Sequence, residues 1–495
     1  MLLLFYIKFM EGMHLRKITV ITTDCQRVLN SPDGKNLAEL LSENGFTVPA
    51  ACGQKGTCGK CRVKLISGMF NGEKPDEHGT IRSCKATVCG DAVINADFRE
   101  GIGLTEFSSE AETEKGTCGI AIDIGTTTIA AALIKKDGTS AFLSCLNPQS
   151  VYGADVVSRI ESCSNGALNK LTELIRNCIN GIIEKLDTEK NAQELIISGN
   201  TTMLHIFCGI SPESMGVFPF KPQFTDVQCL NGSDIGLRTE KITVLPSVSA
   251  FIGSDIVSGI YALELHKTDK TIFLADLGTN GELVLAHKGK LYCTSTAAGP
   301  ALEGACIECG VGGVDGAIDK VFDENGEIGF TTIGNVKPIG ICGAGITDAI
   351  ALLLNNKLID SSGYLENNVR ISDNVYISPK DVRQFQLAKS AVYSGIETLC
   401  EVVGTDKNSI DSFLIAGGLG YYINQNSAIT VGLLPNISTE KIKAAGNTSL
   451  QGALMCIGND NAVKEMCSIS KICSLINLGG NPNFSQKFMD NMFFD

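Results

Sequence analysis

One strand–turn–strand pattern occurs twice in this chain of 495 residues, at 119–138 (GIAIDIGTTTIAAALIKKDG) and at 271–290 (TIFLADLGTNGELVLAHKGK). Each copy contains an apolar strand, the motif Asp-x-Gly-Thr, a second apolar strand and a turn. A supersecondary unit repeated at this distance predicts two similar lobes, each with an Asp-tipped β-hairpin. The segments 168–185 and 382–402 have the apolar spacing of helices.

The residues of the two repeated turns are suited to binding phosphate and Mg²⁺. Glycine lets the backbone approach a phosphate, and threonine hydroxyls and backbone N–H groups can donate to its oxygens. Asp123 ends the first strand and is placed to hold Mg²⁺ through water, and Asp276 repeats this position in the second lobe. The expected nucleotide contacts are Gly125, Thr126, Thr127 and Thr128 in the first turn and Gly278, Thr279, Asn280 and Gly281 in the second.

A third glycine-rich turn, AGGLG, follows an apolar strand and carries Gly417 and Gly418. Its glycines suit close packing against an adenosine. A single Asp-x-Gly-Thr is more often an ordinary hairpin than a phosphate loop, but two near-copies followed by this turn favour an ATP cleft. The sequence has neither GxxxxGK[ST] nor a GxGxxG between a strand and a helix with a partner acid.

Four cysteines near the N-terminus have the spacing C-x5-C-x2-C-x22-C and are Cys52, Cys58, Cys61 and Cys84. Three thiolates in a short glycine-containing loop can surround a small inorganic centre and direct backbone N–H groups at its sulfurs. The plant-type [2Fe–2S] spacing is C-x4-C-x2-C. This loop is one residue longer and resembles the adrenodoxin and putidaredoxin branch of that fold. We therefore expect a [2Fe–2S] cluster in a ferredoxin-like domain.

Other cysteines offer alternatives. Cys89 competes with Cys84 as the fourth ligand, and the Arg-x-Cys context of Cys84 resembles the position of the fourth ligand in the family that this loop resembles. A zinc site would be expected to have two CxxC pairs, and the N-terminal region has one. Cys306, Cys309 and Cys342 could hold a second metal, but buried packing cysteines are commoner.

Composition restricts the class of protein. A net charge of −13 argues against general affinity for nucleic acid. No apolar run reaches the roughly 18–20 residues of a transmembrane helix. Scattered cysteines without a signal-peptide pattern are typical of a reducing cytosol, so we expect a cytoplasmic protein. The pattern along the chain predicts a [2Fe–2S] β-grasp domain, an acidic linker, a first ATPase lobe and a second lobe with the adenosine turn, at 16–100, 101–116, 117–270 and 271–495.

The two Asp-Gly-Thr turns and the AGG turn, in this order, resemble the acetate kinase, sugar kinase, Hsp70 and actin superfamily, whose two RNase H-like lobes close over ATP–Mg²⁺. Fusion of such an ATPase to a [2Fe–2S] ferredoxin resembles the RACo-like reductive activators of corrinoid-dependent methyltransferase systems. The implied fold is multidomain, α+β and α/β. The resemblance also rests on the stretches 147–160, 198–210, 245–260, 295–310, 340–350, 386–396 and 446–454.

The resemblance implies ATP-dependent transfer of one electron from the cluster to a corrinoid protein, converting inactive Co(II) to Co(I). It also implies a low-potential electron donor and a homodimer. Asp123, Asp276 and Glu303 are the expected catalytic residues, and Gly343 and Gly345 join the expected nucleotide contacts. A structural helix-cap role is the alternative for Glu303.

Two further residues and two further functions stay open. Asp255 is a candidate to join Asp123 and Asp276 at the metal, and His205 is more typical of a core histidine bonded to the backbone than of a cofactor ligand. The chain could instead be a nucleotide-binding redox sensor without significant turnover. It could also activate another low-potential enzyme, although such activators hold a [4Fe–4S] cluster at a dimer interface and lack the ferredoxin domain.

Overall fold

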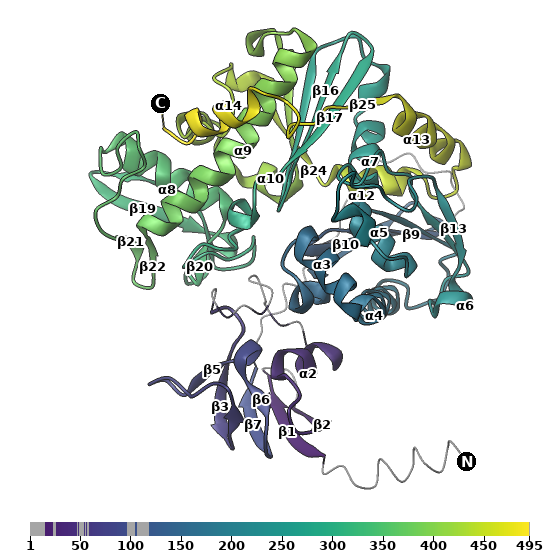
Figure 1. Ribbon diagram of the computed structural model, residues 1–495, viewed down its shortest axis with the longest axis vertical. Coiled ribbons are helices and arrows are strands. Elements are labelled where there is room, and N and C mark those ends of the chain that lie inside the picture. The colour runs from purple at the N-terminus through teal and green to yellow at the C-terminus, as the bar shows by residue number, and fades with distance from the viewer. Residues whose placement is uncertain are drawn as a thin grey trace.

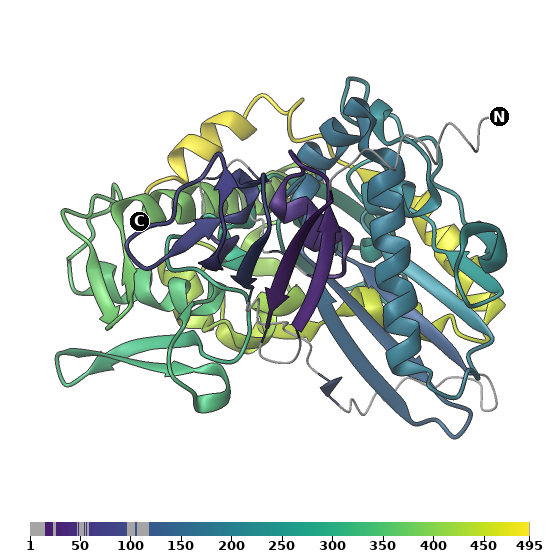
Figure 2. The ribbon, with the colours of Figure 1, turned by 90° about the horizontal axis from the view of Figure 1, so that it is seen from below.

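The computed structural model describes residues 15–22, 26–46, 48, 54, 56, 59–96, 104–105 and 118–494. A small N-terminal domain lies beneath two larger lobes (Figure 1). Seen from below, its strands lie across the junction between the two lobes (Figure 2). No helix within these described ranges is both long and apolar enough to cross a bilayer.

In the described residues, the N-terminal domain has a five-stranded sheet, a two-stranded sheet (β4 and β6), one α-helix and one 3-10 helix. The strand order is β2-β1-β7-β3-β5, in which β1 pairs antiparallel with β2 and parallel with β7. Helix α2 begins after Asn36, whose side chain accepts hydrogen bonds from the N–H groups of Ala38 and Glu39. The elements are β1 (Arg16–Ile21), β2 (Gln26–Ser31), α2 (Leu37–Glu43), β3 (Arg62–Ser67), β4 (Phe70–Asn71), β5 (Thr80–Arg82), η1 (Ser83–Lys85), β6 (Thr87–Val88) and β7 (Ala92–Asn95).

The first lobe has a seven-stranded sheet with the order β13-β14-β12-β9-β10-β11-β8. Its strands are β8 (Leu104–Thr105), β9 (Gly119–Ile124), β10 (Thr128–Ile134), β11 (Ser140–Leu146), β12 (Glu194–Gly199), β13 (Gln228–Asn231) and β14 (Lys241–Val244). Strand β8 falls in the expected linker 101–116 and pairs with β11 at the edge of this sheet. The other residues of 101–116 lie outside the described part of the chain.

The second lobe has a six-stranded sheet with the order β24-β23-β15-β16-β17-β25. The run β24-β23-β15-β16-β17 has the same strand directions as β14-β12-β9-β10-β11 of the first lobe. This repeated topology confirms the predicted pair of similar lobes. The strands are β15 (Ile272–Leu277), β16 (Gly281–His287), β17 (Lys290–Thr296), β23 (Ser412–Ala416), β24 (Ile442–Gly446) and β25 (Cys473–Leu475), with β18 (Ala317–Glu324), β19 (Glu327–Thr332), β20 (Gly340–Ile341), β21 (Val369–Ser372) and β22 (Val375–Ile377) in smaller sheets.

Helices cover these sheets. The predicted helices at 168–185 and 382–402 are found as α4 (Leu168–Leu186) and α9 (Pro379–Val403). Helix α4 buries residues three and four positions apart, as a helix packed on a sheet should. The others are α3 (Val156–Ser162), α5 (Thr201–Cys208), α6 (Gly232–Ile235), α7 (Ser254–Ala262), α8 (Gly343–Asn355), α10 (Gly417–Tyr422), α11 (Gln425–Thr430), α12 (Thr448–Met455), α13 (Asp460–Ile472) and α14 (Phe484–Asp490).

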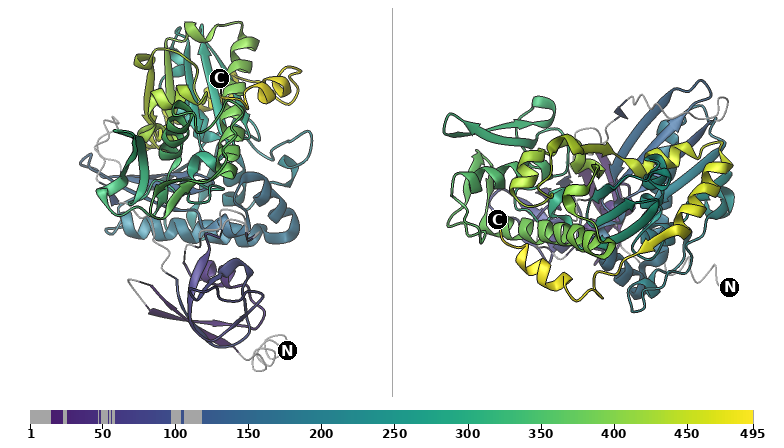
Figure 3. Two further views of the ribbon diagram at one scale, coloured as in Figure 1. Left: turned by 90° about the vertical axis from the view of Figure 1, so that its left-hand side faces the viewer. Right: turned by 90° about the horizontal axis from the view of Figure 1, so that it is seen from above.

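The two lobes meet where α7 packs against α12 (Figure 1). Two further views show the N-terminal domain and the lobes from the side and from above (Figure 3). Two glycines permit the close crossing. A Cβ on Gly452 would overlap the carbonyl of Ser258, and one on Gly259 would lie 2.7 Å from Thr448 Oγ1. Buried apolar side chains of both lobes, such as Ile256, Leu274 and Leu450, share one core here. The crossing therefore joins the two lobes through close helix packing and a shared apolar core.

Candidate nucleotide cleft and cluster loop

Asp123 stands at the end of β9 and is held from the other lobe. Asn447 Nδ2 donates to its Oδ2 at 3.0 Å, and Ser449 Oγ donates to its Oδ1 at 2.8 Å. Asn447 is also the N-cap of α12, and its side chain accepts from the backbone N–H of Leu450. The end of the first hairpin is thus fixed to the start of a helix that belongs to the lobe junction.

The two repeated turns meet directly in the cleft. Thr127 Oγ1 and Thr279 Oγ1 lie 3.2 Å apart and both donate to Glu303 Oε2, at 2.8 and 2.6 Å. Glu303 is the last residue of the 3-10 helix η6 (Pro300–Glu303). Its carboxylate joins the two turns and does not cap a helix, so the helix-cap alternative for this residue is wrong. A catalytic role for Glu303 stays a prediction.

Five carboxyl groups gather around these turns, and burial raises the pKa of each; nearby carboxyl charges add to this for Asp255, Asp276 and Glu282. Burial, and then the negative charge of Asp123, raise the pKa of Asp255 to about 7. Burial, and then Asp255, Asp123 and Glu303, raise the pKa of Asp276 to about 7. Burial also raises the pKa of Asp123, of Glu303 and of Glu282, whose side chain is 8% exposed. Such a cluster favours a bound cation.

The cluster is not a ready-made metal cage. Within the described ranges, no three His, Cys, Asp or Glu side chains are arranged to hold a metal ion. Mg²⁺ commonly keeps several waters and binds one or two carboxylates together with substrate phosphates. The carboxyls of Asp123, Asp255 and Asp276 fit that kind of binding.

The first turn is supported from below by two buried side chains. Asn147 Nδ2 donates to the carbonyl of Gly125 at 2.8 Å, and the Asn147 N–H donates to the carbonyl of Thr127 at 2.8 Å. The fully buried Arg159 donates to the carbonyl of Thr126 at 2.6 Å and to that of Gly153 at 3.0 Å. Burial lowers the pKa of Arg159 to about 9. These bonds fix the backbone that the phosphate would approach.

The second turn is supported by close packing. The N–H of Gly278 donates to the carbonyl of Asn280 at 3.0 Å. Gly417 has a φ of +83°, and a Cβ there would lie 2.9 Å from Asp276 Oδ1. The predicted adenosine turn therefore contacts the second Asp-Gly-Thr turn. Nothing lies within 4 Å of the Cβ position of Gly418, so this glycine faces open space.

The other expected nucleotide glycines are explained by packing. A Cβ on Gly343 would overlap the carbonyl of Leu302, and one on Gly345 would overlap that of Ile318. Gly281 lies against Thr296 and Val392. Close approach of another backbone accounts for Gly343 and Gly345, and packing against side chains accounts for Gly281. A direct contact of these glycines with nucleotide stays a prediction.

The cluster loop is described in part, because Cys52 and Cys58 lie outside the described residues. Cys61 and Cys84 are buried, with 1% and 5% exposed, and the N–H of Ser83 donates to the carbonyl of Cys61 at 2.9 Å. Arg82 Nη1 donates to the carbonyl of Gly56 at 2.8 Å and ties the loop to the segment before Cys84. Gly56 and Gly59 have φ values of +78° and +66°, as a curled loop requires. This donor set fits a small iron–sulfur cluster.

The remaining candidates lie elsewhere. Cys89 Sγ is directed at the carbonyl of Met69 at 3.4 Å, and Cys309 Sγ at the carbonyl of Asn374 at 3.7 Å, while Cys342 is buried before α8. His205 is a core histidine, as predicted. Its Nδ1 bonds to the carbonyl of Thr201 at 2.8 Å, and its Nε2 accepts from the N–H of Gln223 at 3.1 Å.

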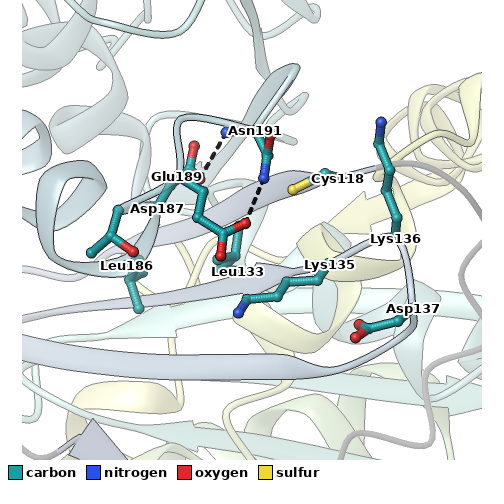
Figure 4. A pocket seen from close by; sticks show the side chains of 10 residues that line it. Cys118, Leu133, Lys135, Lys136, Asp137, Leu186, Asp187, Glu189 and Asn191 are labelled. Atoms are coloured by element: carbon teal, nitrogen blue, oxygen red, sulfur yellow. Dashed lines mark hydrogen bonds between the residues drawn. The ribbon is translucent and has the colours of Figure 1, made fainter.

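A hollow of about 260 Å³ lies at the opposite end of the first lobe's sheet (Figure 4). Lys135, Lys136, Asp187 and Glu189 line it, with Cys118 just before β9. Asp123 is five residues further along this strand, at roughly 3.3 Å per residue, so the hollow is separate from the turns. It does not belong to the nucleotide site.

Three family models match the chain in sequence. The 2Fe-2S iron-sulfur cluster binding domain matches residues 21–89, the RACo middle region matches 118–268, and the C-terminal domain of RACo, the ASKHA domain, matches 270–495. The corrinoid activation enzyme RamQ of Eubacterium limosum is 34% identical over 438 residues, which are 80% of this chain and 73% of that protein. The chain belongs to the RACo-like family.

Further relatives agree with this assignment. The [Co(II) methylated amine-specific corrinoid protein] reductase of Methanosarcina barkeri is 24% identical over 395 residues, covering 71% of this chain and 72% of that protein. The solved structure of a reductive activator for corrinoid, iron-sulfur protein has a TM-score of 0.71 at 24% identity and covers 96% of this chain and 98% of that one. This likeness confirms the expected fold, a β-grasp ferredoxin domain followed by a two-lobed ATPase-type domain.

Several residues of this RACo-like site were not singled out from the sequence. Asn447 and Ser449 lie in the stretch GNTSLQGAL, and Asn147 and Arg159 lie in NPQSVYGADVVSRI. Both stretches contribute to the resemblance to RACo-like activators, but the sequence assigns no role to these single residues. Glu282 carried a signal of its own, because it is an acid within the apolar strand GELVLAH.

Proposed function

We propose that this chain uses ATP binding and hydrolysis to drive one electron from a [2Fe–2S] cluster to a corrinoid protein, reducing its cobalt from Co(II) to Co(I). The observation that carries the proposal is the meeting of Thr127, Thr279 and Glu303 between two phosphate-type turns, in a chain that also holds a ferredoxin domain. The corrinoid activation named for RamQ supports the choice of partner.

In the cleft, backbone N–H groups and threonine hydroxyls of the two turns bind the phosphates, and Gly418 leaves room on the adenosine side. Asp123 is oriented by Asn447 and Ser449, so it can hold a water of Mg²⁺ without rearrangement. Asp276 and Asp255 would hold the cation together with the phosphates, and its positive charge would lower the pKa of both carboxyls. Glu303, once a phosphate has taken over the hydroxyls of Thr127 and Thr279, could orient a water near the terminal phosphate.

In the ferredoxin domain, Cys52, Cys58, Cys61 and Cys84 would hold the cluster. A [2Fe–2S] cluster supplies a one-electron carrier that a low-potential donor refills. Plant-type clusters lie near about −400 mV, and for one electron each further ~59 mV uphill costs about 1.4 kcal/mol. ATP-driven movement of the lobes supplies the free energy for this uphill electron transfer. The protein is proposed to act as a homodimer in the cytoplasm.

The deciding experiment measures Co(I) formation on a Co(II) corrinoid protein under anaerobic conditions, with reduced protein and with or without Mg–ATP. We expect reduction that requires ATP and ATP turnover that rises with the corrinoid protein. Equal reduction with and without nucleotide would refute the proposal. Tight ATP binding with negligible hydrolysis would favour the redox-sensing alternative.

A matched pair of variants tests the ligand set. Cys84→Ser should lose the visible absorption of the cluster and all cobalt reduction, while its ATP binding is unchanged. Cys89→Ser should keep the cluster absorption and the cobalt reduction, since Cys89 Sγ is directed at the carbonyl of Met69. The reverse result would make Cys89 the fourth ligand.

A further inference from the structure

The ferredoxin domain is attached to the first lobe by a broad contact. Val151 of η2 (Pro148–Tyr152) and Leu174 of α4 are part of the ferredoxin domain's own apolar core. Ser42 Oγ donates to the carbonyl of Pro148 at 3.3 Å, and Lys170 forms an ion pair with Glu43 at 3.4 Å. Apolar burial of this kind makes the ferredoxin domain move with the first lobe.

The same domain reaches the second lobe through Lys60, which lies between the ligand positions Cys58 and Cys61. Lys60 Nζ donates to the carbonyl of Gly304 at 2.8 Å and also to the carbonyl of Gly310. Two carbonyls and one ammonium group make a specific contact, which we call the Lys60 latch. It consists of Lys60, Gly304 and Gly310.

The latch depends on the two glycines. Gly304 has a φ of +74°, and a Cβ there would overlap the backbone of Val311. A Cβ on Gly310 would overlap the carbonyl of Gly304. The backbones at 304 and 310 can therefore pack against each other, which directs both carbonyls at one cation. Gly304 also ends the 3-10 helix η6, where a carbonyl attracts a positive charge.

The latch is one residue away from the nucleotide cleft. Glu303 precedes Gly304 and accepts hydrogen bonds from Thr127 and Thr279, the hydroxyls expected to bind phosphate. Each hydroxyl has one proton to donate, so a phosphate oxygen competes with the carboxylate of Glu303 for it. The negative charges of the phosphate and of the Glu303 carboxylate also repel each other. Phosphate binding should therefore displace Glu303 and, with it, the carbonyl of Gly304.

The first-lobe side of the cluster loop has a matching connection. Gln54 donates to the carbonyl of Val151, and Arg159 links the neighbouring Gly153 to Thr126 in the first turn. Two described residues of this segment thus contact different lobes, Gln54 the first and Lys60 the second. If the lobes rotate about the α7–α12 crossing, either the Gln54 contact or the Lys60 latch must be strained. Among the described residues, the apolar core of the ferredoxin domain includes side chains of the first lobe and none of the second, so the latch is the weaker contact.

We propose that Lys60 is a positioning residue that holds the cluster loop against the second lobe, and that nucleotide binding opens this latch. Opening would expose the side of the cluster loop that faces residues 304–310, which is where an electron acceptor could then approach. The identity of that acceptor as a corrinoid protein rests on the proposed function, but the opening itself does not.

Hydrogen–deuterium exchange of the cluster-loaded full chain tests the latch without any corrinoid protein. In the wild type, Mg²⁺ with a non-hydrolysable ATP analogue should speed exchange in 304–311 by ~5-fold or more, since local opening exposes these amides. Lys60→Gln should show this faster exchange before nucleotide is added, and the analogue should add little. Lys64→Gln, which removes another lysine of the same domain, should behave as the wild type.

Two results would overturn the latch. The first is that, without nucleotide, residues 304–311 are equally protected from exchange in Lys60→Gln and in the wild type. The second is that nucleotide binding increases the protection of these residues in the wild type. The visible spectrum of the cluster shows that each variant is folded, and Lys60→Met serves as a second variant. A failure of ATP-dependent cobalt reduction with an intact exchange response would count against the proposed function and leave the latch standing.

Discussion

The two Asp-Gly-Thr turns have similar sequences but different surroundings. In the first, Asp123 accepts hydrogen bonds from Asn447 and Ser449, and Arg159 and Asn147 hold the backbone of the turn. In the second, Asp276 accepts no hydrogen bond from the residues that the structure describes, and it lies against Gly417 among other carboxyls. Asp123 is therefore held in place before any ligand binds, whereas Asp276 is free to change its charge when a ligand binds.

This contrast separates two tasks that the sequence repeat alone would assign equally to both turns. A carboxylate with two donors is preorganised and costs little to use as a cation site. A carboxyl with a pKa near 7 and no donors changes its charge when a cation or phosphate approaches. We therefore expect Asp123 to position the metal and Asp276 to take part in turnover.

The largest effect should come from Asp276→Asn. Loss of this titrating group should reduce ATP turnover by ~10²–10⁴-fold, as expected when an acid–base group is removed. Thermal stability should be unchanged or higher, because one member of a repelling carboxyl cluster is neutralised. Steady-state phosphate release and a thermal melt measure both. Turnover within a few-fold of the wild type would show that the two turns do not divide the work in this way.

Asp123→Ala should weaken Mg–ATP binding by about 10–100-fold and also cost roughly 1–3 kcal/mol of stability, because Asn447 and Ser449 lose a charged acceptor. Calorimetric titration and urea unfolding give the two numbers. Asp276→Ala provides the comparison, since it leaves no donor unpaired among the described residues. Equal losses of stability in the two variants would contradict the contrast.

Ser449→Ala should have a smaller effect, about 3–10-fold on the affinity for Mg–ATP, since one of the two donors to Asp123 remains and one hydrogen bond is worth roughly 1 kcal/mol. Ser468→Ala, in an exposed serine of α13 that bonds to the carbonyl of Lys464, is the matched control. If Ser449→Ala were silent in titration calorimetry, Asp123 would not depend on this donor for its orientation.

The smallest effect concerns pH. Asp255 and Asp276 have pKa values of about 7, against an ordinary value of 3.8, so between these limits the folded protein holds protons that the unfolded chain has released. The contribution of these two groups to the free energy of unfolding therefore falls as pH rises from about 4 to 7. Urea unfolding in EDTA at pH 5.5 and 7.5 measures this fall, and Asp255→Asn should make it shallower. A fall of unchanged steepness would show that Asp255 is not protonated in the folded state.

The parts of this molecule that the sequence predicted are local. The apolar strands, the Gly-Thr turns, α4 and α9 follow from patterns within a few consecutive residues. The contacts that make the site specific are not local. Asn447 meets Asp123 across 324 positions, and Lys60 meets Gly304 across 244. No period or motif encodes such a pair, because nothing in the segment around Asn447 or Lys60 points to a partner hundreds of positions away.

The glycines also show that a local sequence pattern does not determine the role of a residue. Gly417 and Gly343 occur in similar glycine-rich stretches that both look suited to a nucleotide, yet Gly417 contacts Asp276 in the cleft and Gly343 packs against Leu302. A glycine that admits a ligand and one that admits a neighbouring backbone have the same sequence signal. The two are separated only by the fold around them.

The shared core between the ferredoxin domain and the first lobe has a consequence for how this chain can be dissected. Val151 and Leu174 are side chains of one domain that complete the interior of another. A fragment beginning at 118 would present these two side chains to water, and an isolated ferredoxin fragment would lose part of its interior. The ferredoxin domain and the two lobes are therefore not modules that can be exchanged freely. Inheritance and engineering alike must carry them together.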